Sequence, residues 1–133
     1  ALAEVSGAEK VIASLDARMG EVYLAAYRKL GSEWQTVIEP GLYKPDAVPR
    51  IEGADWVGAG SGWQTYGAQL SQHYLGSVTD THPSLLPSAS AMLQLAMPIF
   101  ARGEAKPAHE AMPIYIRNRV ALTTKEREQG LRL

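Results

Sequence analysis

A glycine-rich stretch, Gly58-Ala59-Gly60-Ser61-Gly62, has the spacing closest to that of a ligand-binding loop. It lies between an apolar segment and a helical pattern, where nucleotide-binding proteins place glycine-rich turns. The pattern is incomplete, because Trp63 stands where G-x-G-x-x-G needs glycine and no Lys-Ser or Lys-Thr pair completes a Walker A loop. Ser61 also lies one position too late for a G-x-S-x-G nucleophile elbow. The stretch therefore favours a structural turn beside a buried Trp63.

The remaining titratable side chains form no catalytic pattern. His73, His82 and His109 are far apart, and none stands at the spacing of a metal-ligand motif such as H-E-x-x-H. Asp16 and Glu21 could be drawn as a carboxylate pair for acid–base chemistry, but roles in a turn or at the surface explain both. The residues themselves therefore predict no catalytic residue and no metal site.

The stretch from Val11 to Arg28 is the element around which these residues are organised. Two runs rich in β-forming residues, 11–15 and 22–27, flank Arg18, Met19 and Gly20. Gly20 accepts a positive φ without strain, so the pattern predicts a tight antiparallel hairpin. Neither face of the two strands is consistently polar, and we therefore expect the hairpin to lie inside a sheet that is covered on both sides.

Residues 16–23, Asp-Ala-Arg-Met-Gly-Glu-Val-Tyr, directly follow an apolar strand and resemble the signature of the TsaB family, also called YeaZ. Members are the non-catalytic, glycoprotease-like subunit of the bacterial machinery that makes threonylcarbamoyladenosine (t6A) in tRNA. They have two halves related to actin, Hsp70 and sugar kinases, and this hairpin opens the second half. The resemblance covers nearly all of this chain but about half of a family member.

The resemblance implies a division of the chain into three parts. Residues 1–8 are expected to be the end of a helix and a linker from a missing N-terminal half, with Gly7 suited to cap that helix. Residues 9–121 are expected to form the C-terminal actin-like domain, and residues 122–133 a charged tail.

The order of predicted elements defines an α/β fold. It is the order of one ribonuclease H-like half of the actin-like (ASKHA) architecture, in which three antiparallel strands continue into parallel strands of a mixed sheet with helices on both faces. After the hairpin we expect strands at 34–38, 55–58 and 75–80, and helices at 63–74 and from Ser88 or Ser90 to Gly103.

Prolines and glycines set several of these boundaries. Glu39-Pro40-Gly41 is expected to end the third strand, and Lys44-Pro45-Asp46 to begin a short helix. Pro98 lies inside the last helical pattern and is expected to kink it.

In working members of the actin-like superfamily, the first hairpin of each half holds phosphate through an acidic residue and small turn residues. Asp16 and Gly20 occupy corresponding positions, but Arg18 and Met19 stand where Gly or Thr is usual. We favour a pairing or capping role for Asp16 and Arg18, and no cofactor is predicted. The degenerate phosphate-loop candidates are Asp16, Gly20, Gly58 and Gly60.

The C-terminal segment Pro-Ile-Tyr-Ile-Arg-Asn-Arg-Val-Ala, residues 113–121, resembles the end of family members, and we expect Pro113, Tyr115 and Arg117 to dock it onto the domain. Basic residues outnumber acidic ones from Ile114 onward. A basic tail could contact tRNA phosphates or an acidic partner, but interleaved acids favour a solvated tail.

Composition narrows the class of protein further. The 133 residues carry a formal net charge of -1, with 46% hydrophobic and 20% charged residues, which is typical of a globular domain. The absence of Cys excludes disulfides, and near-neutral charge argues against binding nucleic acid by overall charge. No apolar run reaches membrane-spanning length, so we expect a cytoplasmic protein that does not enter a membrane.

The resemblance implies a scaffold or activator without its own activity. Its expected partners are the catalytic subunit TsaD, which transfers threonylcarbamoyl from threonylcarbamoyl-AMP to adenosine 37 of tRNA, and the ATPase TsaE. A homodimer through the missing N-terminal half and indirect contact with tRNA through the complex are also implied. The alternative is a nucleotide-dependent enzyme of the same superfamily, such as a kinase or an acyl-transfer ATPase, and a stand-alone interaction domain is a third possibility.

Overall fold

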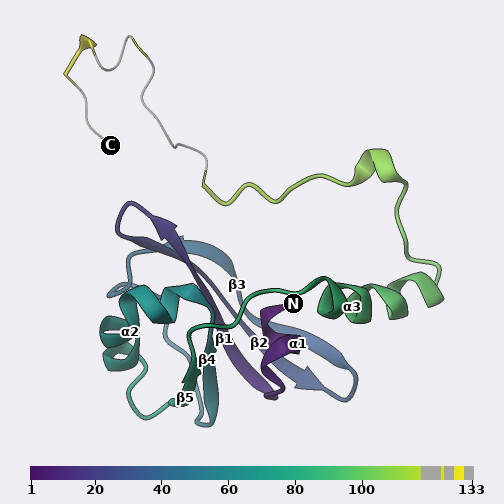
Figure 1. Ribbon diagram of the computed structural model, residues 1–133, viewed down its shortest axis with the longest axis horizontal. Helices are drawn as coiled ribbons and strands as arrows, with labels where there is room; N and C mark the ends of the chain where they lie inside the picture. Colours follow the sequence, from purple (N-terminus) through teal and green to yellow (C-terminus); the bar gives the residue numbers. More distant parts are fainter. Residues whose placement is uncertain (118–123, 125–127, 131–133) are drawn as a thin grey trace.

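The computed structural model describes residues 1–117, 124 and 128–130, so most of the predicted charged tail lies outside the described residues (Figure 1). Five strands form one sheet in the order β3-β2-β1-β4-β5. β1 pairs antiparallel with β2 and β2 with β3, whereas β4 runs parallel to β1 and β5 parallel to β4. The predicted mixed sheet is therefore confirmed. The elements are α1 (Leu2–Ser6), β1 (Lys10–Arg18), β2 (Glu21–Leu30), β3 (Glu33–Tyr43), β4 (Trp56–Ala59), α2 (Ser61–His73), β5 (Val78–His82), α3 (Ala89–Ala101) and the 3₁₀ turn η1 (Ala108–Glu110).

The predicted hairpin is formed by β1 and β2, with Arg18 paired to Glu21 across a two-residue loop. Met19 and Gly20 have φ values of 58° and 76°. Positive φ at both loop residues matches the natural twist of a hairpin, which explains why Met19 shares the conformation that we expected of Gly20 alone. A register shift between Asp16 and Arg18 adds a bulge immediately before the loop, and Arg18 itself has a φ of 63°.

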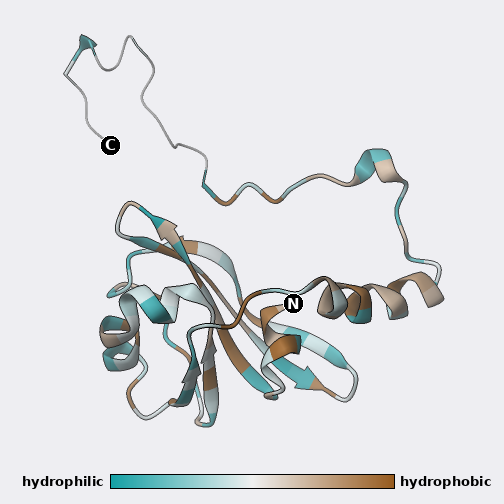
Figure 2. Ribbon diagram, in the orientation of Figure 1, coloured by the Kyte–Doolittle hydropathy of each residue, from teal (hydrophilic) through white to brown (hydrophobic). Residues whose placement is uncertain are grey.

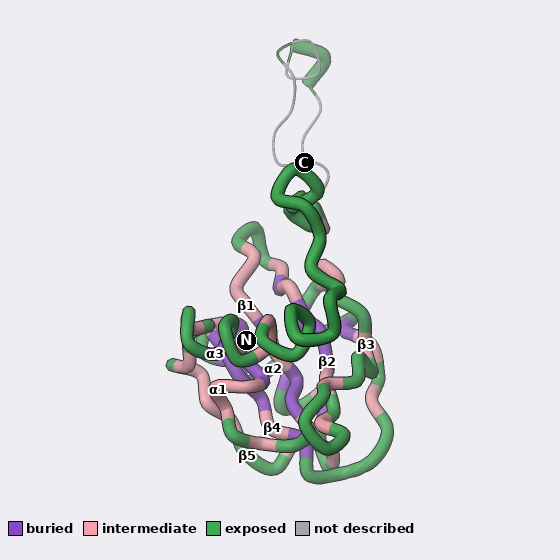
Figure 3. Tube along the Cα trace, turned by 90° about the vertical axis from the view of Figure 1, so that its right-hand side faces the viewer, coloured by how far each residue is buried: buried purple, intermediate pink, exposed green. Residues whose placement is uncertain are grey.

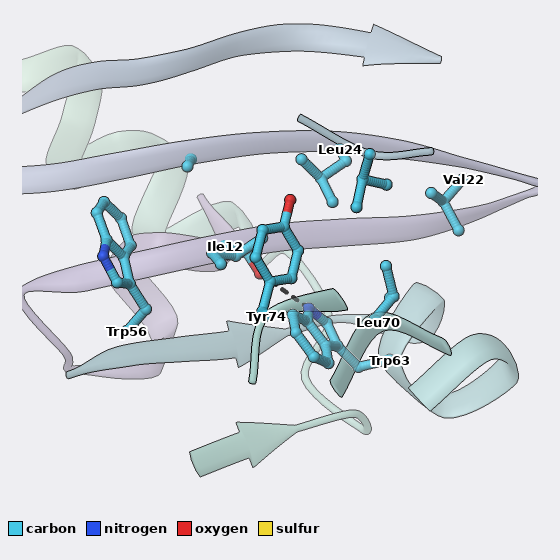
Figure 4. Close-up of a cluster of buried hydrophobic side chains, with 9 residues drawn as sticks. Ile12, Val22, Leu24, Trp56, Trp63, Leu70 and Tyr74 are labelled. Atoms are coloured by element: carbon cyan, nitrogen blue, oxygen red, sulfur yellow. Dashed lines mark hydrogen bonds between the residues drawn. The ribbon is translucent and has the colours of Figure 1, made fainter. Parts of the chain in front are cut away.

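One face of the sheet is covered by α2 (Figure 4). Trp63, Leu70 and Tyr74 pack onto alternate residues of the hairpin strands. The indole N–H of Trp63 donates to the carbonyl of Ile12 at 2.9 Å, so this large side chain buries its only polar atom with a partner. The buried residues of this core are Ile12, Val22, Leu24, Ala26, Val48, Trp56, Trp63, Leu70 and Tyr74.

The opposite face is covered in part by α1, which packs Ala3 against Val11 and Ala59. Gly7 ends this short helix with a φ of 70°, as its position predicted. The carboxylate of Glu4 accepts from the indole N–H of Trp34 at 2.7 Å and lies 3.4 Å from the Lys29 ammonium, which ties α1 to β2 and β3. Helices therefore lie on both faces, as expected.

Two local predictions are wrong. The third strand was expected to end at residues 39–41, but β3 continues through Pro40 to Tyr43. β3 is the edge strand, where the N–H that a proline lacks costs little. Register shifts between Leu24 and Ala26 of β2 absorb the remaining irregularity. Residues 45–46 form a turn closed by the Ala47 N–H and the Lys44 carbonyl at 3.0 Å, and no helix begins there. Pro49 removes the backbone N–H that would bond to the Pro45 carbonyl in a helix that began here.

The last helix begins where predicted. The Ser88 hydroxyl caps α3 by accepting from the Ala91 N–H at 3.2 Å, and Gly103 follows its end with a φ of 71°. α3 continues through Pro98, the residue that was predicted to kink it, and ends at Ala101. A residue with non-helical dihedral angles lies instead inside α2, where Tyr66 has φ -123° and ψ 26°.

Candidate functional site

Asp16 lies where the hairpin meets the start of α2. Its carboxylate accepts from the Arg18 backbone N–H at 2.8 Å, lies 3.5 Å from the Arg18 guanidinium, and is 3.5 Å from the Thr65 hydroxyl. The Asp16 N–H donates to the hydroxyl of Ser61 at 3.1 Å. Asp16 therefore caps the turn next to it and joins the hairpin to α2. This agrees with the pairing or capping role that the sequence favoured for Asp16 and Arg18.

The Gly58–Gly62 turn is filled by the protein itself. A side chain at Gly58 would run into the Trp63 ring, and one at Gly62 into the Ser14 side chain. Gly58 belongs to the β4 ladder, and the Gly60 N–H donates to the His82 carbonyl at 3.1 Å. The N–H of Gly60, which a phosphate-binding turn would offer to its ligand, is thus already bonded.

The β1–β2 turn holds the side chain of Arg117, which lies about a hundred residues away along the chain. The guanidinium Nη2 donates to Glu21 Oε2 at 2.7 Å, to the Ala17 carbonyl at 3.1 Å and to the Arg18 carbonyl at 3.4 Å, while Nη1 lies 2.8 Å from the Met19 sulfur. The Arg117 side chain is only 8% exposed. The prediction that Arg117 docks the C-terminal segment is therefore confirmed.

This arrangement sets the electrostatic character of the turn. Carbonyl and carboxylate oxygens of the turn converge there on the Arg117 guanidinium, so its Nη2 is bonded within the protein and is not offered to a phosphate. Gly20, the remaining residue of the predicted set, lines a shallow pocket of about 270 Å³ together with Lys44 and Tyr66. The four phosphate-loop candidates thus divide between the hairpin, with Asp16 and Gly20, and the filled turn, with Gly58 and Gly60.

A groove of about 560 Å³ lies on the sheet face opposite α2. Apolar and aromatic side chains of β1 and β2 form its floor, and residues of the C-terminal segment form a wall. Such a groove is the usual form of a binding site for an apolar or aromatic group. The lining residues are Leu2, Ala13, Leu15, Tyr23, Leu24, Ala25, Tyr27, Pro40, Ile114, Tyr115, Ile116 and Arg117.

Helix α3 presents a second apolar surface. Its 13 residues include no charged side chain, and Ala91 is the residue of the helix that is buried. One side contributes to a cleft of about 300 Å³ with Glu4 and Trp34, and Arg102 just after the helix pairs with Glu33 at 2.8 Å. Figures 2 and 3 show the helix as hydrophobic and largely exposed. The other side, which we call the α3 surface, consists of Met92, Leu93, Met97 and Phe100, exposed by 60–69%.

The histidines and carboxylates that the structure describes form no metal-binding cluster. In the described part of the chain, no group of three or more His, Asp or Glu side chains is placed to hold a metal ion. His82 lies 3.5 Å from Asp80 at the surface, and His73 contacts the Tyr74 ring edge-on. Asp16 and Glu21 bond to different groups, the α2 start and Arg117.

Across residues 1–117, 124 and 128–130, no helix is both long and apolar enough to cross a membrane.

Sequence reasoning identified Arg117 but missed its three oxygen acceptors, Glu21 and the carbonyls of Ala17 and Arg18, and the part that Glu4 plays. Glu21 was visible only as a possible acidic partner of Asp16, and the contact between Glu4 and Trp34 spans 30 residues. Tyr115 lines the groove but is 74% exposed, and Pro113 is exposed as well, so Arg117 is the anchor of the segment.

The sheet order and the two helix-covered faces define an α/β domain built like one half of an actin-like protein. Two solved structures from Pseudomonas aeruginosa share this fold. One, described as an uncharacterized protein with similarity to peptidase YeaZ, matches 87% of this chain and 55% of its own with a TM-score of 0.77 and 36% identity. The other, YeaZ, matches 86% of this chain and 54% of its own, with a TM-score of 0.69 and 35% identity.

Curated proteins give the same result at the level of sequence. The tRNA threonylcarbamoyladenosine biosynthesis protein TsaB of Escherichia coli K12 is 37% identical over 122 residues, covering 87% of this chain and 51% of the relative. The Haemophilus influenzae protein of the same name is 31% identical over 126 residues, covering 88% and 51%. No protein-family model matches. The predicted resemblance is confirmed: the chain is a homologue of TsaB (YeaZ) proteins and spans about half the length of the curated relatives it matches.

Proposed function

We propose that this chain is the C-terminal actin-like domain of a TsaB-like subunit, which takes part in forming t6A in tRNA as a binding module without its own catalysis. The observation that carries the proposal is the 37% identity to a TsaB protein over 122 residues. In this proposal, residues 1–8 end a helix from an N-terminal half, residues 9–121 are the domain, and residues 122–133 are its tail.

The geometry of the hairpin supports a non-catalytic role. The turn that holds phosphate in working superfamily members is here occupied by the Arg117 side chain, and the Gly60 N–H is bonded to His82. A fold can persist after its reactive groups are lost, because stability depends on the core and not on the site.

The apolar surfaces support a binding role. The uncharged helix α3 exposes several large apolar side chains, and the groove is lined mainly by apolar and aromatic ones. Exposed apolar surfaces of this kind are typical of binding sites. We propose that the complete protein works with a TsaD-like catalytic subunit and a TsaE-like ATPase in the cytoplasm, contacts tRNA through that complex, and forms homodimers through its N-terminal half.

The test uses the complete protein that contains this chain. It is assayed for capture of a TsaD-like subunit and for restoring t6A in cells depleted of TsaB, as wild type and as Asp16→Asn. The variant keeps the size of Asp16 and one acceptor oxygen for the Arg18 N–H, but it removes the charge and replaces the other oxygen with an NH2 donor. We expect both forms to capture the partner and restore t6A, because the turn is a structural element in this proposal.

Two outcomes would contradict the proposal. Failure of the folded wild-type protein in both assays would show that the relationship to TsaB does not extend to function. ATP hydrolysis by the purified protein that Asp16→Asn abolishes would favour the alternative, a nucleotide-dependent kinase or acyl-transfer ATPase. Leu75→Asn, at an 86% exposed position, is the matched surface control for loss by misfolding.

A further inference from the structure

Residues 111–117, which we call the strap, return from η1 toward the hairpin without regular secondary structure (Figure 1). Residues 111–115 are exposed, and Ile116 and Arg117 are half-buried. The Ala111 N–H bonds to the Ala108 carbonyl, and within the described residues no backbone hydrogen bond follows it along the strap. The strap is therefore held on the domain by side chains.

Arg117 supplies the polar part of that attachment. Its guanidinium reaches the carboxylate at the start of β2 and two carbonyls at the end of β1, so a single side chain contacts both strands of the hairpin. The bonds are charge-assisted, and the Arg117 and Glu21 side chains are only 8% and 30% exposed, which limits screening by solvent. All three oxygen contacts come from Nη2, and Nη1 contacts the Met19 sulfur. A lysine side chain ends one bond earlier and carries a single nitrogen, so it cannot place donors at both positions.

The strap is also a wall of the groove. Ile114, Tyr115 and Ile116 face a floor that includes Tyr23 and Ala25 of β2. Tyr115 and Ile114 remain 74% and 84% exposed, so their packing alone holds the wall weakly. Removal of the strap would leave the groove floor open to solvent along one side.

We propose that Arg117 is a latch that holds the strap against the sheet and that its release opens the groove. The latch also supports the turn, because its acceptors include the carbonyl of Arg18, which has the left-handed φ of 63°. This conformational device rests on the contacts of residues 111–117 and does not depend on the proposed role in t6A formation.

The chain contains no cysteine, so an introduced thiol can report on each face of the sheet separately. Ala25→Cys places a thiol on the groove floor, where Ala25 is 6% exposed, and Ala26→Cys places one in the core beneath α2, where Ala26 is 0% exposed. The rate of modification of each thiol by a maleimide is measured with and without Arg117→Lys. Arg102→Lys, which alters a surface ion pair with Glu33 and Glu104, is the matched control.

We expect Arg117→Lys to accelerate modification of Ala25→Cys by roughly ten-fold, the effect of losing one charge-assisted interaction, and to leave Ala26→Cys unchanged. Arg102→Lys should change neither rate. Glu21→Gln weakens the same contact from the other side and should accelerate Ala25→Cys by a smaller factor.

Unchanged modification of Ala25→Cys in both Arg117→Lys and Glu21→Gln would overturn the latch. Equal acceleration at Ala25→Cys and Ala26→Cys in either variant would also overturn it, because the contact would then stabilise the whole fold and not the strap. Glu21→Gln decides the question if Arg117→Lys does not fold.

Discussion

The two faces of the sheet are built from the same hairpin but are completed in different ways. On the α2 face, Leu70 and Ile12 are fully buried, and Trp63 and Tyr74 are 4% and 2% exposed. On the opposite face, Tyr23 and Tyr27 are half-buried along a groove, and α3 keeps the α3 surface in solvent.

This difference shows which part of the fold the chain completes within itself. Burial of large apolar side chains supplies most of the driving force for folding, and the α2 face buries the larger cluster, so it contributes the larger share of the stability of the domain. The other face retains apolar area that is available for further contacts. Matched substitutions on the two faces test this division.

The largest difference is expected between Leu70→Ala and Leu93→Ala. Leu70 is 0% exposed in the core, and its truncation should lower the free energy of unfolding by about 3 kcal/mol, because it leaves a cavity. Leu93 is 66% exposed on α3, and the same change should cost less than about 0.5 kcal/mol. Urea denaturation of the 133-residue chain measures both. A similar loss at Leu93 would show that the α3 surface is packed in solution.

An intermediate effect is expected within α2, where Gly62→Ala and Gly67→Ala share one helix. A methyl group at Gly62 would collide with the Ser14 side chain, and overpacking of this kind costs about 2 kcal/mol. Gly67 has open space around it, so alanine should raise the free energy of unfolding by about 0.5–1 kcal/mol through its better helix propensity. Thermal unfolding followed by circular dichroism checks both signs, and stabilisation by Gly62→Ala would contradict the close packing of α2 on β1.

The smallest effect concerns Glu4 on the open face. The Trp34 N–H lowers the pKa of the Glu4 carboxyl below its ordinary 4.5, burial opposes this shift, and Lys29 reinforces it. A lowered pKa in the folded state means that the stabilisation is present above pH 4.5 and is lost as the pH falls through the lowered value.

Glu4→Gln should therefore reduce stability at neutral pH by less than about 1 kcal/mol, and the difference from wild type should shrink below pH 4.5. Denaturation curves across this pH range test the sign. Trp34→Phe removes the donor, so the effect of Glu4→Gln should be smaller in that background; an equal effect in both backgrounds would show that the contact is not formed.

Sequence reasoning predicted the features that depend on neighbouring residues. The apolar residues on both faces of the hairpin indicated a doubly covered sheet. Ser88 or Ser90 and Gly103 marked the limits of α3, and residues 16–23 indicated the resemblance to TsaB proteins. The same reasoning was wrong at Pro40, because the cost of a proline in a strand depends on whether that strand lies at the edge of the sheet.

The local sequence therefore determined the hairpin and the ends of α1 and α3, since φ preferences, capping and apolar periodicity act over a few residues. Only the tertiary structure decided that Arg117 meets Glu21, 96 residues away, and that Glu4 meets Trp34. It also decided that the Gly58–Gly62 turn is filled by Trp63 and Ser14 and that one face of the sheet keeps a groove. These features depend on which segments the sheet brings together, and no local preference specifies that choice.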